Sequence, residues 1–296
     1  MKRAMLIASS EFPQGSGIDR LQFPLNDVME MEKTLRSDDF GFEVEKLENT
    51  TSSLVLHELD QWISKADYED LVLVYFSGHG KLNRSRELFL TCGNTKSENL
   101  ISTALKYSQL TDLIRERSLQ KVAIILDCCY AGRAIEGTRG DPRGAIEEQV
   151  RMAVEVSGSG IFFLGASCKN QTAEEREIDG HGRFTKQIIE GLRSGDADID
   201  NDGDVSAKDL ATYVKQRLRS QSASQELIEG GAYQGELILG SNRRKKLTAR
   251  IRTRIQADKL HFTKETFRKI EDYLDDISGH IEEPVHSIRR KVKEDC

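Results

Sequence analysis

The chain has 296 residues, of which 38% are hydrophobic and 31% are charged, and its formal net charge is −6. This length can bury one or two sizeable cores, and no apolar run approaches the ~20 residues that a membrane span requires. The negative charge argues against wholesale nucleic-acid binding, and the adjacent Cys128 and Cys129 are typical of reduced thiols, not of a disulfide framework. The first apolar stretch, residues 4–8, is too short for a signal peptide. We therefore expect a soluble, cytoplasmic protein without a membrane anchor.

Strand and helix signals alternate along the first 240 residues. Short apolar runs such as residues 71–76 are typical of buried strands, whereas residues 26–35 carry apolar side chains at helical spacing. This alternation predicts an α/β sandwich with a mostly parallel sheet, in which active sites gather at the carboxyl ends of the strands. In chain order we predict strand 4–8, helix 26–35, strand 42–47, helix 51–63, strand 71–76, helix 105–117, strand 122–126, strand 161–166, helix 184–192, helix 210–218 and strand 236–239.

Two segments depart from this alternation. Residues 133–159 form the longest irregular stretch, and long loops of this kind are usually functional or open to cleavage. Residues 241–296 carry 15 Lys and Arg against 10 Asp and Glu, a balance of +5, whereas residues 1–240 carry 28 against 39, a balance of −11. Apolar residues at helical spacing predict two or three amphipathic helices after residue 241. We therefore divide the chain into an acidic body, residues 1–240, and a basic helical extension, residues 241–296.

Two of the predicted buried strands run into reactive residues. Residues 71–76 are followed by Ser77-Gly78-His79-Gly80, and residues 122–126 by Asp127-Cys128-Cys129. On neighbouring strands, the imidazole of His79 and a thiol would share one crevice, which is the arrangement that nucleophilic thiol catalysis needs. The plainer interpretation is a hydrogen-bonded loop histidine beside small buried cysteines. The interval of about 50 residues between His79 and Cys129 matches the His-to-Cys interval of caspases and favours the catalytic interpretation.

The sequence resembles the caspase and metacaspase superfamily, and most of all its bacterial caspase-like members. Residues 75–80 (YFSGHG) and 126–132 (LDCCYAG) are similar to the two catalytic motifs of that family, although Tyr130-Ala131 stands where metacaspases commonly have His-Ser. Residues 25–28 resemble the turn after its first strand, and residues 163–167, 171–173 and 182–185 resemble its small-subunit half. The resemblance covers about residues 3–240. It implies a caspase-like three-layer sandwich with a large-subunit-like part (1–132), a linker (133–159) and a small-subunit-like part (160–240).

This resemblance implies the chemistry of a cysteine endopeptidase. His79 and Cys129 would form a catalytic dyad that needs no cofactor, and the amides of Cys129 and Gly80 would donate to the oxyanion. Cys129 is preferred to Cys128 as the nucleophile because the family pattern is Asp-x-Cys, which leaves Cys128 pointing into the fold.

Charge predicts the side chain that the enzyme would accept. A pocket for Arg or Lys needs carboxylates, whereas a pocket for Asp needs a cation. The resemblance implies that Asp27, in the Asn-Asp-Val turn, and Asp127 line such an acidic pocket. The alternatives are that Asp27 only favours a helix N-terminus and that Asp127 is a structural anion. Cleavage after Arg or Lys would make Arg133, Arg139, Arg143 and Arg151 candidate self-processing sites, although an exposed loop also carries arginines for solubility.

A second motif predicts a calcium loop in residues 198–209, with an acidic turn that caps the next helix as the alternative. Oxygen-bearing side chains stand at loop positions 1, 3, 5, 9 and 12, and Gly203 stands at position 6, as a Ca²⁺ loop between helices requires. Asp209 occupies position 12 in place of the usual Glu, which predicts weak affinity and a structural role. The carboxylates proposed as ligands are Asp198, Asp200, Asp202, Asp204 and Asp209.

The basic extension is assigned to protein contact. It complements the acidic body in charge and would bind that body or another protein, such as an activator. Nucleic acid is a weaker alternative, because little aromatic interleaving accompanies the basic residues. Family analogy favours an activator-regulated protease in bacterial stress, cell-death or antiviral defence. The competing functions are a catalytically silent caspase-like adaptor and an aspartate-specific caspase.

Overall fold

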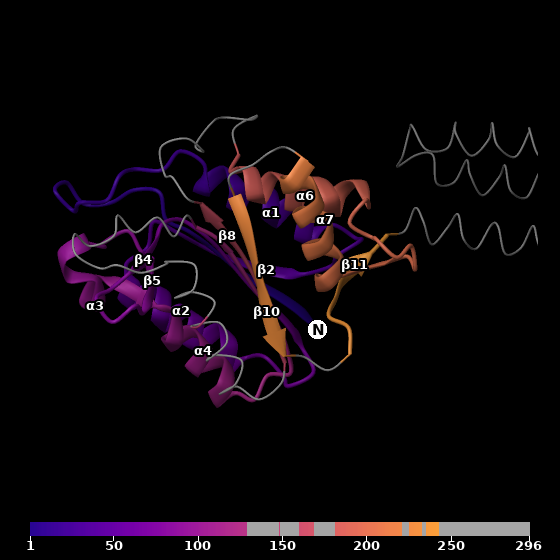
Figure 1. The fold of residues 1–296 in the computed structure, drawn as a ribbon. Coiled ribbons are helices and arrows are strands. Elements are labelled where there is room, and N and C mark those ends of the chain that lie inside the picture. Colours follow the sequence, from indigo (N-terminus) through magenta and orange to yellow (C-terminus); the bar gives the residue numbers. More distant parts are fainter. Residues whose placement is uncertain (129–147, 149–159, 169–180, 221–224, 233–234, 243–296) are drawn as a thin grey trace, which may run out of the picture. The chain divides into compact units, whose positions relative to one another are not determined.

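The computed structural model describes residues 1–128, 148, 160–168, 181–220, 225–232 and 235–242 (Figure 1). Backbone contacts divide the chain into two units, Met1–Lys245 and Lys246–Cys296. The second unit lies outside the described residues, as do the predicted linker apart from Glu148 and nearly all of the basic extension. In the part of the chain that the structure covers, no helix has the length and apolar character to span a membrane.

A six-stranded sheet forms the centre of the first unit, with the strand order β10-β8-β7-β3-β1-β2. Five strands are parallel, and β10 pairs antiparallel with β8 at one edge. This confirms the mostly parallel sheet predicted from the alternating apolar runs. The strands are β1 (Lys2–Ala8), β2 (Glu43–Glu48), β3 (Leu71–Ser77), β7 (Lys121–Asp127), β8 (Ile161–Cys168) and β10 (Gln225–Ala232).

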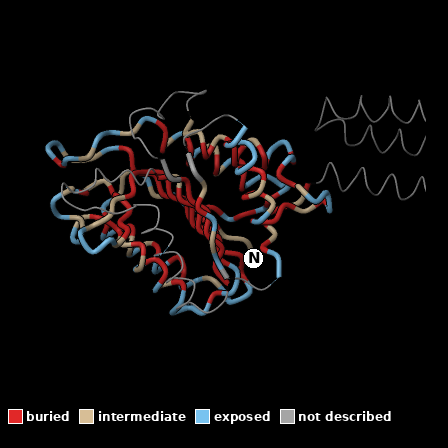
Figure 2. The backbone as a smooth tube through the Cα atoms, in the orientation of Figure 1, coloured by how far each residue is buried: buried red, intermediate tan, exposed pale blue. Residues whose placement is uncertain are grey.

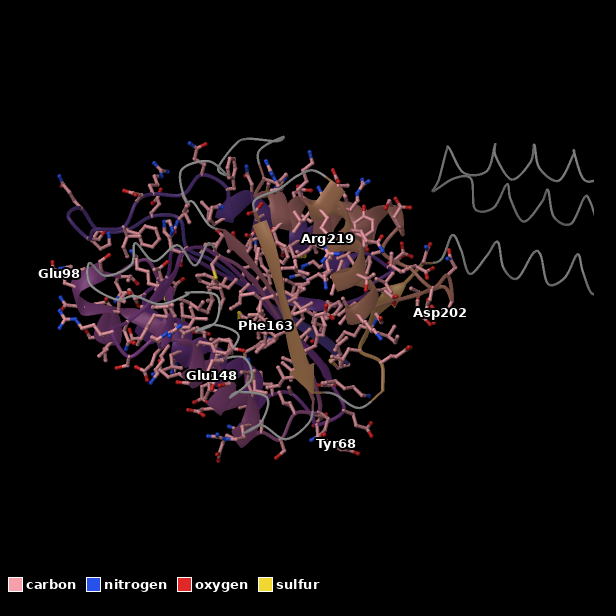
Figure 3. All side chains as sticks on the ribbon, in the orientation of Figure 1. Tyr68, Glu98, Glu148, Phe163, Asp202 and Arg219 are labelled. Carbon is pink, nitrogen blue, oxygen red and sulfur yellow. The ribbon has the colours of Figure 1, made fainter. Side chains whose placement is uncertain are left out.

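Helices cover both faces of the sheet, because successive residues of each strand point to opposite faces. One face packs on α1 (Pro24–Arg36), α6 (Arg183–Ser194) and α7 (Ala207–Ser220), and the other on α2 (Ser52–Ser64) and α4 (Tyr107–Glu116) (Figure 1). The sheet is therefore the buried middle layer of three (Figure 2). Phe163 of β8 is fully buried there, with its ring 6.0 Å from that of Tyr107 in an edge-to-face contact (Figure 3).

Smaller elements lie at the margins of this sandwich. β4 (Gly80–Leu82), β5 (Leu88–Thr91) and β6 (Ala104–Lys106) form an antiparallel sheet, and η1 (Ser97–Asn99) and α3 (Leu100–Thr103) precede β6. β9 (Asp204–Ser206) pairs with β11 (Ile238–Ser241). The last predicted strand, 236–239, thus corresponds to β11, which pairs with β9 outside the central sheet. The edge strand of the central sheet is β10, which the sequence pattern did not predict.

Candidate active site

The carboxyl ends of β3 and β7 lie side by side. These strands pair in parallel with Ser77 opposite Asp127, and the Gly78 N–H donates to the carbonyl of Asp127 at 3.1 Å. His79 therefore lies just beyond the end of β3, and β3 is the neighbour of β7, which ends at Asp127. Two residues beyond this pair, the chain reaches His79 on one side and Cys129 on the other. The strand register thus accounts for the 50-residue interval seen in the sequence.

His79 is held rigidly in the loop between β3 and β4. Its side chain Nε2 lies 2.9 Å from the carbonyl oxygen of Asp19, and its own carbonyl accepts from the N–H and hydroxyl of Thr91. The ring of Phe12 covers it, with the two centroids 5.6 Å apart. A carbonyl can only accept, so Nε2 carries the proton and Nδ1 of the neutral ring is an acceptor. Burial lowers the pKa of the His79 imidazole, which favours that neutral form at pH 7.

Gly80 begins β4 next to His79, opposite Leu90 of β5. The Thr91 N–H donates to the His79 carbonyl, so the neighbouring Gly80–Leu90 pair occupies a position of the antiparallel ladder without hydrogen bonds. The N–H of Gly80 therefore points away from β5.

Of the two adjacent cysteines, Cys128 is among the described residues and Cys129 is not. Cys128 is only 1% exposed and packs in the core between the sheet and the layer of α2 and α4. This burial agrees with the prediction that Cys128 points into the fold. Cys129 lies outside the described residues, as do Arg133, Arg139, Arg143 and Arg151 of the linker.

Asp27 lies in the first turn of α1, and its carboxylate also accepts hydrogen bonds from residues outside that helix. Oδ1 accepts from the Gly182 N–H and lies beside Nδ1 of His181, both at 3.1 Å, and Oδ2 accepts from the hydroxyl of Ser77 at 3.2 Å. The residue is 1% exposed. Burial raises the pKa of the Asp27 carboxyl, although the hydrogen bonds from His181 and Gly182 oppose that rise.

Asp127 is held by a short chain of hydroxyl groups. Thr185 Oγ1 donates to Asp127 Oδ2 at 2.5 Å, and the hydroxyl of the buried Tyr75 lies 2.6 Å from Thr185 Oγ1. Because the Thr185 proton goes to the carboxylate, Tyr75 donates to Thr185. Burial, followed by the negative charge of Asp27, raises the pKa of Asp127 to about 7, against an opposing effect of the hydrogen bonds from Thr185.

Gly182 marks the space that the two carboxylates share. A β-carbon built on this residue would lie 2.9 Å from Asp127 Oδ2 and 3.1 Å from Asp27 Oδ2. Two carboxylates that face one small space hold less than two full negative charges at neutral pH, and an incoming cation favours the ionised form of both. No role was predicted from the sequence for His181, Gly182 or Thr185, which lie at or just before the start of α6. The only signal for Gly182 and Thr185 was that residues 182–185 resemble the family's small-subunit half, and His181 had none.

Comparison with known families matches this architecture. A family model described as the caspase domain matches residues 1–247. The chain belongs to the caspase family. This places its first 247 residues among cysteine-peptidase domains, as the resemblance of the two strand-end motifs implied.

A solved structure shares the fold of this caspase domain. It is the crystal structure of protein GSU0716 from Geobacter sulfurreducens, with 14% identity and a TM-score of 0.54. The match covers 79% of this chain and 94% of the other. At that identity the likeness concerns the fold alone. No curated protein matches the chain.

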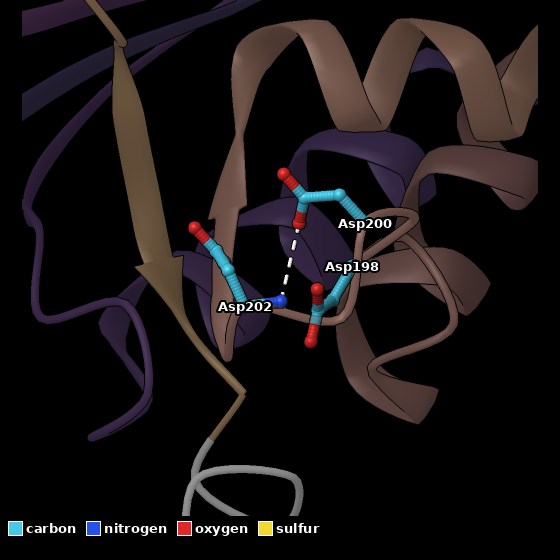
Figure 4. Close-up of side chains that lie close together, drawn as sticks. All are labelled: Asp198, Asp200 and Asp202. Atoms are coloured by element: carbon cyan, nitrogen blue, oxygen red, sulfur yellow. Dashed lines mark hydrogen bonds between the residues drawn. The ribbon is translucent and has the colours of Figure 1, made fainter.

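The acidic loop of the caspase domain brings together three of the five predicted ligands. Carboxylate oxygens of Asp198, Asp200 and Asp202 lie within 4.8 Å of one another, with Asp198 buried and the other two exposed (Figure 4). Asp204 and Asp209 are not part of this group. Asp204 Oδ1 accepts from the hydroxyl of Ser241 at 3.2 Å, whereas Asp209 Oδ2 accepts from the N–H and hydroxyl of Ser206 at the start of α7. Asp209 therefore caps α7, as the alternative interpretation expected of this loop.

Proposed function

We propose that this caspase domain is a cysteine endopeptidase that cleaves protein substrates after Arg or Lys, with His79 and Cys129 as its catalytic dyad. The observation that carries the specificity is the pair of carboxylates, Asp27 and Asp127, which face one space next to the loop of His79. A guanidinium or ammonium group in that space would pair with both carboxylates, whereas an aspartate side chain would add a third negative charge.

The reaction follows from the tautomer of His79. Nδ1 accepts the proton of the Cys129 thiol, and the thiolate attacks the carbonyl carbon after the basic residue. The carbonyl oxygen becomes an oxyanion, for which the N–H groups of Gly80 and Cys129 are the proposed donors. Collapse of this intermediate breaks the peptide bond, and His79 returns the proton to the leaving amine. Water then hydrolyses the thioester with the same residue as general base, which regenerates the thiol and releases the acid.

The two competing functions fit these contacts less well. A silent adaptor has no need for a rigid histidine in one tautomer beside two carboxylates of raised pKa, an arrangement typical of functional sites. An aspartate-specific caspase needs a cation at the base of its pocket. The histidine nearest to Asp27, His181, donates to that carboxylate, and both pocket acids remain to repel an aspartate.

The family setting extends this proposal to regulation. We place the protease in the cytoplasm, where a reduced thiol persists, and in bacterial stress, cell-death or antiviral defence. The basic extension, residues 241–296, would receive an activator or another regulatory protein. The arginines of the 133–159 linker suit cleavage by a second copy of the same enzyme, since they match the proposed specificity.

We also propose that the acidic loop binds Ca²⁺. Hard oxygen ligands suit this ion, and Asp198, Asp200 and Asp202 supply them from one turn. Gly203, at φ +92°, allows the chain to reverse beyond them. Asn242 supports the loop, because its side-chain amide donates to the Gly195 carbonyl and to Asp198 Oδ2, and its own N–H donates to the Gly203 carbonyl. The ion would stabilise the fold and take no part in the dyad.

Peptide hydrolysis tests the enzyme and its specificity together. Fluorogenic peptides that end in Arg, Lys, citrulline or Asp are compared with and without Ca²⁺, for the full chain and for Cys129→Ala. Citrulline has the shape of arginine without its charge. We expect turnover of the Arg or Lys peptides only, and none in the variant. Cys128→Ala is the matched control, because Cys128 is buried in the core and should leave turnover intact.

Two results would contradict the proposal. Turnover of the Asp peptide alone would overturn the acidic pocket. If no peptide is cleaved, an electrophilic arginine derivative should still label Cys129 in a latent enzyme, and failure to label would favour the adaptor.

A further inference from the structure

One histidine stands beside the acidic pocket, outside the proposed dyad. His181 precedes the N-cap residue of α6, and its Nδ1 lies 3.1 Å from Asp27 Oδ1. The side chain of His181 is 21% exposed whereas that of Asp27 is 2% exposed. His181 can therefore exchange protons with solvent while it contacts a carboxylate that is nearly enclosed.

The charges that face His181 come from two helices. Asp27 and Glu30 of α1 favour its protonation, and Lys186 of α6 opposes it. Glu30 already pairs with Lys33 at 2.5 Å and with Arg193 at 2.7 Å, and Lys186 lies 3.8 Å from Glu190. Asp27 is thus the dominant partner, and the hydrogen bond to it raises the pKa of His181 above that of an ordinary histidine.

The contact also orients the Asp27 carboxylate. Oδ1 is occupied by His181 and by the Gly182 N–H, so Oδ2 is the oxygen that faces the space shared with Asp127. Ser77 donates to Oδ2 itself, so both oxygens are held and the plane of the carboxylate has little freedom. The donor at position 181 therefore helps to hold Oδ1 away from the space that a basic ligand would enter.

We propose that His181 is a specificity-tuning residue of the pocket: its Nδ1–H orients Asp27, and its protonated form competes with the basic side chain of the substrate. This inference rests on the proposed function, since it concerns the same pocket. The neutral imidazole does not offset the negative charge of the pocket, which stays open to Arg or Lys. The imidazolium offsets the charge of Asp27, so its formation weakens the preference for a basic side chain.

Substitutions at position 181 separate orientation from charge. His181→Asn keeps a neutral donor close to the place of Nδ1, whereas His181→Ala removes both the donor and the charge. His57→Asn is the matched control, because His57 is an exposed histidine on α2 that contacts Gln61. For each protein, kcat and KM are measured at pH 6.0 and 8.5 with an arginine peptide and with its citrulline counterpart.

The expected results differ between the variants. At pH 6.0 the arginine-to-citrulline ratio of kcat/KM should be about threefold to tenfold higher in His181→Asn than in the unaltered enzyme, and at pH 8.5 the two ratios should agree within about twofold. His181→Ala should raise KM for arginine at pH 8.5, where only the orienting role is lost, with little change in kcat. Equal ratios in His181→Asn and the unaltered enzyme at both pH values would overturn the proposal, as would an unchanged KM in His181→Ala at pH 8.5.

NMR titration tests the contact even if the enzyme cleaves no peptide. The ring proton of His181 should titrate at a higher pH than that of an ordinary histidine, and Asp27→Asn should lower its midpoint. Agmatine, which carries the guanidinium of arginine, should also lower the midpoint of His181, because coupling between two sites is reciprocal. A midpoint unaffected by Asp27→Asn and by agmatine would refute the role of His181. The expected titration together with failed hydrolysis and failed labelling of Cys129 would refute the protease instead.

Discussion

Replacing Gly182 with alanine should weaken the binding of a basic side chain while the domain stays folded. The backbone of Gly182 has φ −60° and ψ 137°, which alanine adopts without strain. The added β-carbon, however, would lie 2.9 Å from Asp127 Oδ2 and 3.1 Å from Asp27 Oδ2. Both carboxylates must therefore retreat by a few tenths of an ångström, and the methyl group fills the space between them.

The size of the effect follows from these contacts. Overpacking of a tight site costs about 1–3 kcal/mol, and alanine is also a poorer N-cap than glycine. We expect a fall in Tm of roughly 3–10 °C, at about 2–4 °C per kcal/mol for a domain of this size. Displacing two buried carboxylates from a cation costs about 2–3 kcal/mol of binding free energy, or roughly 30–150-fold in KM for an arginine peptide.

The assay pairs thermal unfolding with steady-state kinetics. Gly191→Ala is the matched control on the same helix, because its β-carbon would lie 2.5 Å from Cε1 of Tyr213 and far from the carboxylates. This control should lose stability with little change in KM. Wild-type KM in Gly182→Ala, or an equal rise of KM in Gly191→Ala, would refute the assignment of this space to the substrate.

Further predictions concern the groups around the same pocket and the acidic loop. The kcat/KM for an arginine peptide should fall as the pH drops through about 7, because protonation of Asp127 removes a charge that the cation needs, while the citrulline peptide changes little. Asp127→Asn should raise Tm at pH 8, and this gain should disappear as the pH falls towards 4. Folding raises the pKa of Asp127 to about 7, so the ionised carboxylate destabilises the folded state above that pH and the protonated acid does not. Thr185→Val should cost about 1–3 kcal/mol of unfolding free energy, measured by urea titration, because it leaves the buried Tyr75 hydroxyl and Asp127 without their partner. Calcium should raise Tm in the full chain and have no effect in Asp202→Asn, which lacks one cluster carboxylate.

Several elements of the fold could be predicted from local patterns alone. β3 and β7 are continuous apolar runs buried on both faces, and no other structure accommodates such runs so readily in an α/β chain. α6 carries Phe184, Ile188 and Leu192 on one face, which matches the predicted helix 184–192. These signals depend on residues within one element, so they are present before any tertiary contact forms.

The edge strand β10 shows why other elements escaped prediction. Its sequence contains Gly230 and Gly231 and lacks an alternating apolar pattern, so the local signal indicates a turn. Its conformation comes from pairing with β8, where a β-carbon on Gly231 would lie 2.2 Å from the carbonyl oxygen of Ile161. Glycine is required there by the close approach of the neighbouring strand. That requirement is invisible in an isolated segment.

The candidate site divides in the same way. From the sequence alone, motifs next to apolar runs indicate His79 and Cys129, whereas the resemblance to the family indicates Asp27 and Asp127. His79 and Cys129 each stand two residues after a strand end, and this equal offset follows from the pairing of Ser77 with Asp127. Because both strands are buried on both faces, their residues do not alternate, and their register is decided by packing within the sheet.

Only the tertiary structure decided how the pocket is held. Gly182 and His181 contact Asp27 across 155 and 154 residues, and Thr185 contacts Asp127 across 58. These contacts exist because α1 and α6 pack on the same face of the sheet, which brings the start of α6 to the carboxyl ends of the strands. Hydrogen bonds between such distant segments depend on how a helix and a sheet pack, and no local pattern of residues specifies that packing.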